Sequence, residues 1–126
     1  KVVYKITTSE TREGINKGLN AIAHAINMLG CVNISKEDVK IAATIQGPAT
    51  SIILTDEAYQ EKFGKKNPNT EVIELLSQYG VELFVCSQAT AYKKIDASKI
   101  NKNIIEALSG SSVLLNYQLN GYALMQ

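Results

Sequence analysis

Histidine and cysteine are scarce in this sequence, which has one histidine, His24, and two cysteines, Cys31 and Cys86, among 126 residues. So few ligands cannot form a disulfide scaffold or a structural zinc site with four protein ligands. The G-x-G-x-x-G, P-loop, H-E-x-x-H and C-x-x-C motifs are also missing. Nucleotide cofactors, metalloprotease chemistry and thioredoxin-type redox chemistry therefore have no support, and we expect no metal and no cofactor.

An excess of charge of one sign is absent as well. The chain has 13 basic and 12 acidic residues, which gives a formal net charge of +1. This balance favours neither nucleic acid nor a membrane surface as a partner. The tyrosines are few and scattered, so they form no platform for stacking single-stranded nucleic acid. No apolar run approaches the roughly 20 residues that a membrane-spanning helix needs.

The length and composition indicate one globular domain that covers residues 1–126. Apolar residues make up 45% of the chain and charged residues 20%, and a chain of this size buries roughly two thirds of its unfolded surface. The first residue is Lys1 rather than methionine, which indicates a processed or trimmed product. An exported, periplasmic mature chain and a trimmed cytoplasmic chain both fit, so the compartment stays open.

The dominant pattern is an alternation of β-branched runs with helical patterns. We expect strands at residues 1–8, 39–46, 81–86, 103–107 and 121–125. We expect helices from just after residue 11 to 29 and at about 49–63, 68–79, 88–93 and 109–119. Strands that alternate with helices form mostly parallel sheets covered on both faces. The predicted fold is therefore α/β, a three-layer α/β/α sandwich with a five-stranded, mostly parallel sheet.

Cys86 combines reactive chemistry with a suggestive place in this pattern. It ends the mostly apolar run 81–86, and the segment that follows is typical of a helix start. Open α/β sheets bind their ligands at the carboxyl ends of the strands, and a helix amino terminus favours a thiolate over a thiol. The alternative is that Cys86 behaves as a small, buried hydrophobic residue.

Three further residues are candidates for a ligand-binding role beside Cys86. Gly47 and Pro48 end the predicted strand 39–46, so they lie at the same edge of the sheet as Cys86. The backbone N–H groups of Ala49 and Thr50 would then line an anion pocket at the next helix start, although a simple sharp turn fits as well. Gln88 offers a neutral hydrogen bond near the thiol, and a helix cap or surface role is the alternative.

Neither Cys31 nor His24 is expected to assist Cys86. Cys31 follows the first helix, which returns the chain to the amino-terminal edge of the sheet, about 17 Å from the carboxyl edge. A disulfide needs Cα atoms within about 7 Å, so we expect no bridge within the chain. His24 falls opposite the apolar stripe of its helix, which disfavours a Cys–His pair within one subunit and leaves one between subunits open.

Four short motifs occur in a characteristic order: Gly47-Pro48, Asn67-Pro68-Asn69, Val85-Cys86-Ser87-Gln88 and Gly121-Tyr122-Ala123. With these motifs the chain resembles the DsrE/DsrF-like family of small α/β proteins, which includes sulfur-relay subunits. The resemblance implies a trimer or hexamer and, in relay members, a cysteine that carries sulfur as a persulfide, a position that only Cys86 occupies. Ser87 replaces an expected glycine, and Lys93-Lys94 stands where an Arg-Gly pair is common.

These observations lead to two main hypotheses. In the first, the protein is a sulfur (persulfide) carrier or a small-ligand-binding protein, Cys86 is the acceptor thiol, and Gly47, Pro48 and Gln88 shape its surroundings. Its partners would be sulfur donor and acceptor proteins. In the second, the protein is an oligomeric binding or scaffold module in which Cys86 is inert. A thiol hydrolase or transferase is disfavoured because no nearby general base can be named.

Overall fold

Five strands form one parallel sheet in the computed structural model, which describes residues 1–125. The strands are β1 (Val2–Ile6), β4 (Ile41–Ile45), β5 (Glu82–Cys86), β6 (Ile104–Ala107) and β7 (Ala123–Met125). They lie in the order β6-β5-β4-β1-β7, and every neighbouring pair is parallel. The predicted α/β class and five-stranded sheet are confirmed, and the pairing is parallel throughout.

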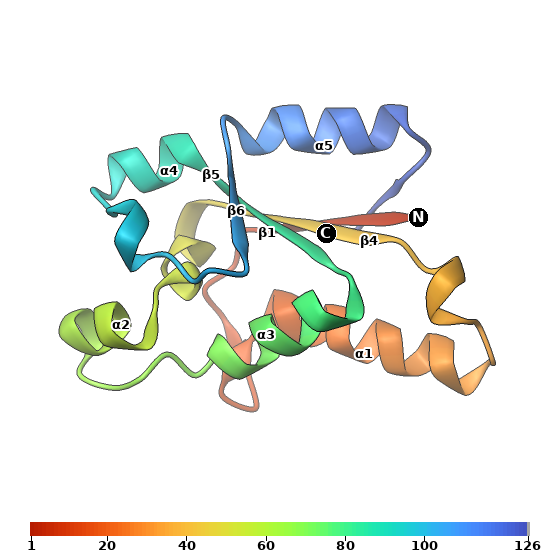
Figure 1. The fold of residues 1–126 in the computed structure, drawn as a ribbon, viewed down its shortest axis with the longest axis horizontal. Coiled ribbons are helices and arrows are strands. Elements are labelled where there is room, and N and C mark those ends of the chain that lie inside the picture. The colour runs from red at the N-terminus through yellow and green to blue at the C-terminus, as the bar shows by residue number, and fades with distance from the viewer. Residues whose placement is uncertain (126) are drawn as a thin grey trace.

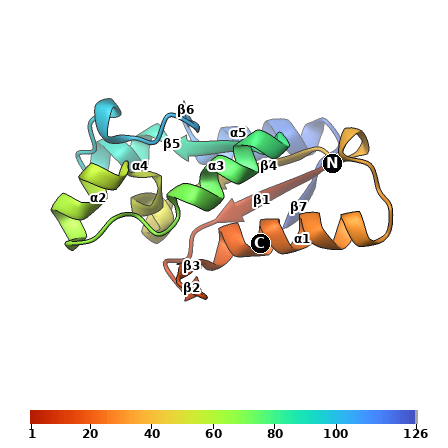
Figure 2. The ribbon, with the colours of Figure 1, turned by 60° about the horizontal axis from the view of Figure 1, so that its bottom comes forward.

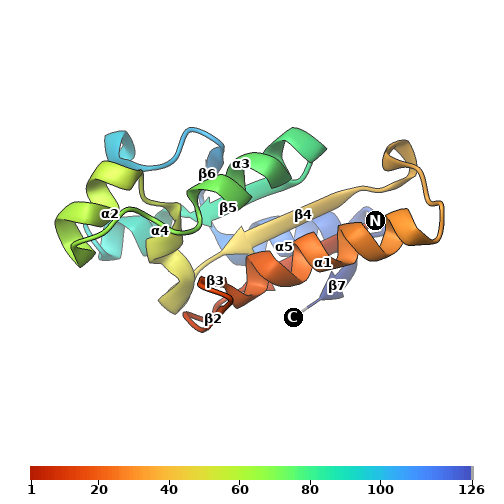
Figure 3. The ribbon, with the colours of Figure 1, turned by 90° about the horizontal axis from the view of Figure 1, so that it is seen from below.

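Helices cover both faces of this sheet. The α-helices are α1 (Lys17–Cys31), α2 (Asp56–Phe63), α3 (Thr70–Tyr79), α4 (Ser87–Tyr92) and α5 (Gly110–Leu119). Figure 1 shows α4 and α5 above the sheet and α1, α2 and α3 below it. Seen from below, α1 and α3 lie next to each other across the strands (Figure 3). Among the described residues 1–125, no helix has the length and apolar character needed to cross a membrane.

The alternation of side chains along β5 determines which of the two helical layers each side chain packs against. Leu83 and Val85 belong to the larger core, between the sheet and the layer of α1 and α3. Phe84 packs instead into the smaller core under α5, together with Leu114. Successive side chains of a strand point to opposite faces, so Cys86 faces the same side as Phe84. The Cys86 thiol therefore belongs to the α5 side of the sheet.

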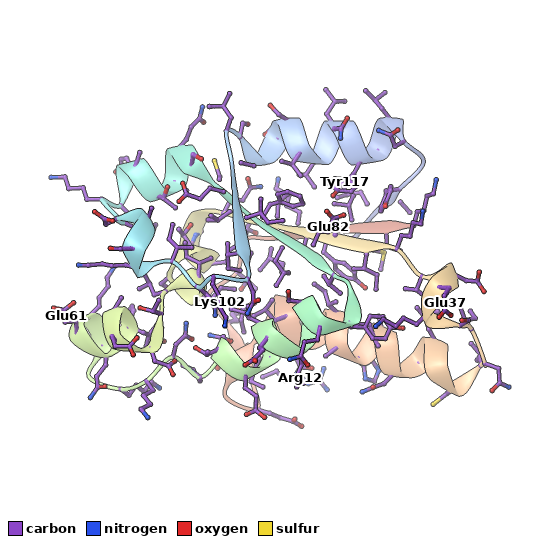
Figure 4. All side chains as sticks on the ribbon, viewed as in Figure 1. Arg12, Glu37, Glu61, Glu82, Lys102 and Tyr117 are labelled. Atoms are coloured by element: carbon purple, nitrogen blue, oxygen red, sulfur yellow. The ribbon has the colours of Figure 1, made fainter. Side chains whose placement is uncertain are left out.

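Helix α5 is fixed on this face by an aromatic contact and a hydrogen bond at its carboxyl-terminal half. The rings of Tyr117 and Phe84 have centroids 5.9 Å apart. The Tyr117 hydroxyl donates to Glu82 Oε1 at 3.0 Å, and the two side chains point toward each other in Figure 4. Burial, followed by the neighbouring Glu82 carboxylate, raises the pKa of Tyr117, so the hydroxyl stays protonated and keeps this bond.

The first helix begins later than predicted, because a small hairpin precedes it. Strands β2 (Thr11–Arg12) and β3 (Ile15–Asn16) pair antiparallel, as Figure 2 shows beside the start of α1. Glu13 and Gly14 form the turn with φ of 57° and 82°, left-handed values that a helix cannot contain. Asn16 then caps α1, since its side chain accepts from the N–H groups at positions 18 and 19.

The second predicted helix, 49–63, is divided in two. A 3-10 helix, η2 (Gly47–Ile53), is followed by extended backbone at Leu54 and Thr55 before α2 begins. Thr55 is the N-cap of α2 and accepts from the Ala58 N–H, while Leu54 forms a β-bridge with Ile100. The short 3-10 helices η1 (Lys36–Asp38) and η3 (Ala97–Lys99) lie in other connections.

Asn67 has a different role from the helix cap predicted for it. Helix α3 begins at Thr70 and its N-cap is Asn69, so neither Asn67 nor Pro68 starts it. The buried Asn67 amide donates to the backbone oxygens of Ile52 at 2.9 Å and Leu54 at 2.8 Å. Its oxygen accepts from the Asn69 N–H at 2.9 Å. Asn67 therefore ties the start of α3 to the end of η2.

Candidate functional site

Cys86 lies at the carboxyl end of β5, at the point where the chain enters α4. It is the N-cap residue of α4, and 9% of its surface is exposed. On one side it pairs in register with Ala107, the last residue of β6. The Ser87 hydroxyl donates to the Ala107 oxygen at 2.8 Å, which fixes the first turn of α4 against β6. The thiol therefore lies at the carboxyl edge of the sheet, the edge at which open α/β sheets commonly bind ligands.

The surroundings of Cys86 favour its thiolate. Burial raises the pKa of the Cys86 thiol, but the backbone N–H groups of Gly110, Ala89 and Gln88 together lower it below its ordinary value. Gly110 is the first residue of α5, and Gln88 and Ala89 lie in the first turn of α4. The sulfur makes no capping hydrogen bond of ordinary geometry to α4, so these N–H groups act as oriented dipoles around it.

Gln46 is a neighbour of Cys86 that the sequence analysis did not name. Ile45 of β4 pairs with Val85 of β5, so one step further along the register Gln46 lies beside Cys86. Its side-chain oxygen packs against Gly110, where the Cβ of any larger residue would overlap it. We call Gln46, Cys86 and Gly110 the Cys86 site. In the sequence, Gln46 stands directly before the Gly47-Pro48 turn, which indicates a residue at the edge of the sheet. Only the register of the strands shows that it lies beside Cys86 of β5.

Gly47 and Pro48 follow Gln46 directly and are both exposed at the start of η2. Gly47 has φ of 60°, a left-handed value that glycine adopts without steric cost. The Thr50 hydroxyl donates to the Gly47 oxygen at 2.7 Å, and the Ala49 N–H donates to the Gln46 oxygen at 3.3 Å. The Ala49 N–H is therefore occupied within the turn, which argues against the anion pocket considered for this segment.

The whole chain, residues 1–126, matches the DsrE/DsrF-like family. The protein belongs to this family. The family is of the sulfur-relay type, and the match covers the Cys86 site together with all five strands of the sheet.

The fold of this DsrE/DsrF-like protein also occurs in a solved structure. The protein of unknown function MTH1491 from Methanobacterium thermoautotrophicum aligns with a TM-score of 0.75 over 98% of this chain and 96% of its own. The two sequences are 16% identical, so the likeness is one of fold. No curated protein matches the chain.

In this DsrE/DsrF-like protein, Gln88 lies next to the Cys86 thiol, whereas Lys93 and Lys94 lie at the other end of α4. The Gln88 side chain is exposed, and it is the backbone N–H of Gln88 that faces the sulfur. Lys93 and Lys94 are exposed at the far end of α4, where they line a hollow of about 460 Å³ with Lys62 and Lys99. These lysines surround a separate, basic depression rather than the Cys86 site.

His24 and Cys31 lie away from the Cys86 site. Both are exposed residues of α1, which covers the face of the sheet opposite to α5. Both cysteines are free thiols. Within residues 1–125, no group of three or more His, Cys, Asp and Glu side chains is arranged to hold a metal ion.

A pocket of about 330 Å³ opens at the same edge of the sheet, beside the end of β1. Its lining includes Lys5, Thr7, Thr8, Glu10 and Lys17. Strand β4 separates β1 from β5, so the two strands lie roughly 10 Å apart. This pocket is a neighbour of the Cys86 site and not part of it.

Proposed function

We propose that the protein is a sulfur carrier in which Cys86 accepts one sulfur atom as a persulfide and passes it to an acceptor. The observation that carries this proposal is the place of the Cys86 thiol where α4 and α5 begin, with the backbone N–H groups of both helix starts facing it and lowering its pKa. A thiolate is the reactive form of cysteine, and backbone N–H groups stabilise it without taking part in the chemistry. Membership in a family of sulfur-relay type supports the same role.

The chemistry needs no other reactant than a donor and an acceptor. In loading, the Cys86 thiolate attacks the outer sulfur of a donor persulfide. An S–S bond forms to Cys86, and the donor thiolate leaves with the electron pair of the broken bond. In delivery, an acceptor thiolate attacks the outer sulfur of the Cys86 persulfide and the Cys86 thiolate leaves. Both steps are exchanges at sulfur, so no oxidant, reductant or general base is consumed.

Three residues complete the proposed surroundings of the carried sulfur. Gly47 and Pro48 turn the chain sharply after β4 and begin η2 at the edge of the sheet where Cys86 lies. Gln88 places its backbone N–H toward the sulfur and its side chain at the exposed rim. In this role the three residues shape access for a donor or acceptor thiol.

Alkylation of the native protein across pH tests the activated thiol, with intact mass as the readout. The variant Cys31→Ser leaves Cys86 as the reporting thiol, and Cys86→Ser is its matched control with only the exposed Cys31. We expect Cys86 to react in the folded protein with an apparent pKa below that of free cysteine in the same buffer. If Cys86 is alkylated only after denaturation, the sulfur-carrier function is wrong.

Loading with inorganic polysulfide then distinguishes a carrier from a merely reactive thiol. The Cys86 thiolate takes one sulfur atom, and a polysulfide shorter by one sulfur leaves. We expect Cys31→Ser to gain the mass of one sulfur and to lose it to a low-molecular-weight thiol. A reactive Cys86 that gains no sulfur would instead indicate a different thiol chemistry.

A second candidate function, an oligomeric module, is favoured by a surface next to the site that carries exposed leucines. Leu108 is 80% exposed, and Leu115 and Leu119, four residues apart on the outer side of α5, are 59% and 78% exposed. We propose that this surface joins copies of the chain in a trimer or hexamer, with or without sulfur transfer. A sizing measurement at micromolar concentration tests it, and a clean monomer would contradict the oligomer.

A further inference from the structure

One buried hydroxyl close to the Cys86 site has no hydrogen-bond partner among the described residues. Thr44 is fully buried in β4, and its Oγ1 neither donates nor accepts. Two other buried threonines differ from it, since the Thr50 hydroxyl donates to the Gly47 oxygen and the Thr90 hydroxyl to the Ser87 oxygen. Buried polar groups are nearly always paired, and an unpaired one lowers stability. The buried, unpaired hydroxyl of Thr44 is therefore unusual and points to a role beyond packing.

The register of the sheet places this hydroxyl on the side of the Cys86 sulfur. Thr44 pairs with Phe84, and Ala42, two residues earlier on the same face, packs under α5. Cys86 lies two residues beyond Phe84, also on this face, so Thr44 and Cys86 are diagonal neighbours. The strand spacing and the rise per residue place their Cα atoms roughly 8 Å apart.

Two further contacts place the first turn of α5 over this part of the sheet. Gln46 follows Thr44 by two residues on the same face and packs against Gly110 at the start of α5. Leu114, one turn further along α5, packs on Ala42. The first turn of α5 thus passes over Thr44. The unpaired hydroxyl is therefore buried beneath this turn, in a side chain on the same face of the sheet as Cys86.

We propose that Thr44 is a positioning residue for the carried sulfur, and that its hydroxyl donates a hydrogen bond to the outer sulfur of the Cys86 persulfide. This inference rests on the proposed function. Loading adds a second sulfur about 2.05 Å from Sγ, which extends the Cys86 side chain on the face of the sheet that it shares with Thr44. The outer sulfur accepts the hydrogen bond for which residues 1–125 offer no acceptor in the unloaded form. A donor held ready in the fold needs no reorganisation when its partner arrives.

The variant Thr44→Val tests this inference, because valine keeps the shape of threonine and removes the hydroxyl. The parent is Cys31→Ser, and the probe is inorganic polysulfide. Urea unfolding midpoints are measured for the unloaded and the loaded protein, and intact mass follows the persulfide lifetime. Thr50→Val is the matched control, since Thr50 is equally buried but its hydroxyl is already bonded to the Gly47 oxygen.

We expect the effect of Thr44→Val to change sign between the two forms. In the unloaded protein the midpoint rises, because an unpaired buried hydroxyl is removed. In the loaded protein the midpoint falls, and the persulfide is lost about fivefold faster, the factor that corresponds to an ordinary hydrogen bond. Thr50→Val should lower both midpoints equally and leave the lifetime unchanged.

Two other outcomes overturn the inference and can be told apart. If the parent takes up sulfur but Thr44→Val shifts both midpoints equally and leaves the lifetime unchanged, Thr44 has only a structural role and the carrier function stands. If the parent gains no sulfur by mass, the carrier function and the role of Thr44 are both wrong.

Discussion

At the scale of single residues, the protein modifies the chemistry of one thiol without a charged partner. Desolvation alone makes a buried cysteine unreactive, and here the backbone N–H groups of Gly110, Ala89 and Gln88 outweigh it. His24 does not assist Cys86 of the same subunit, because it is exposed on the opposite face of the sheet. Such a thiol suits transfer between sulfur atoms, in which the attacking and leaving groups are both thiolates.

The lowered pKa of Cys86 predicts a pH dependence of stability. A depressed pKa in the folded state means that folding favours the thiolate. The resulting stabilisation is present above the ordinary thiol pKa of 9.0 and is lost as the pH falls through the folded-state value. The free energy of unfolding of the wild type, minus that of Cys86→Ser, should therefore increase as the pH rises toward 9.0. Urea unfolding under reducing conditions measures it, and a constant difference would contradict the lowered pKa.

Lys94 gives a second prediction at this scale. It has φ of 55°, in the left-handed region where a side chain is strained and glycine is not. We expect Lys94→Gly to raise the free energy of unfolding by about 0.5–1 kcal/mol, since relief of the strain exceeds the added freedom of the unfolded chain. Thermal or urea unfolding measures the change.

Two control variants separate backbone strain from charge at this position. Lys94→Ala removes the charge but keeps a Cβ, so it should not stabilise the protein. Lys93→Gly should destabilise the protein. Lys93 has φ of −85°, which every residue type adopts without strain, so glycine there only adds conformational freedom to the unfolded chain. Equal stabilisation by Lys94→Ala and Lys94→Gly would show that charge, and not φ, is responsible.

At the scale of elements, the close approach of α5 to β4 forms the Cys86 site. Gly110 has no side chain, so the first turn of α5 comes near enough to contact the Gln46 amide and to direct its own N–H toward Cys86. At its other end α5 is held by Tyr117, through its contacts with Phe84 and Glu82. The position of this one helix thus determines the donors around the sulfur.

Gly110→Ala tests this packing. The added Cβ overlaps the Gln46 side chain, so α5 or Gln46 has to move. We expect a loss of about 1–3 kcal/mol in the free energy of unfolding and a rise in the alkylation pKa of Cys86 as the N–H group withdraws. The double variant Gly110→Ala/Gln46→Ala should recover most of the stability, and Ser111→Ala, next along α5 and exposed, should change little. Full tolerance of Gly110→Ala would contradict the close approach.

At the scale of the whole molecule, α5 has one side on the sheet and two strongly exposed leucines, Leu115 and Leu119, on its outer side. Leu119 is 78% exposed on that outer side and serves as the probe of the proposed interface. We expect Leu119→Lys to convert the oligomer to a monomer, because a buried leucine contributes about 1.5–3 kcal/mol and a buried, unpaired lysine is unfavourable. Light scattering after size exclusion measures the mass. Leu75→Lys is the control, since Leu75 is 57% exposed on α3, across the sheet, and should leave the mass unchanged.

Errors in the predicted elements occurred where turn geometry or long-range hydrogen bonds override a local pattern. The apolar residue Ile15 continued the helical stripe of α1, yet the left-handed turn at Glu13 and Gly14 places it in β3. Asn67 has the composition of a helix cap, but its amide bonds to carbonyls 13 and 15 residues away in the sequence. Neither interaction leaves a periodic signal in the chain.

The amino-acid sequence by itself determined the α/β class, the five strands and the place of Cys86 at a strand end, because periodicity and turn residues act over a few positions. Only the tertiary structure decided the strand order β6-β5-β4-β1-β7, and with it the neighbours of that thiol. Gln46, Gly110 and Thr44 are far from Cys86 in the sequence, and strand register and the packing of α5 bring them together. Contacts of this kind depend on which strands pair, which no local pattern encodes.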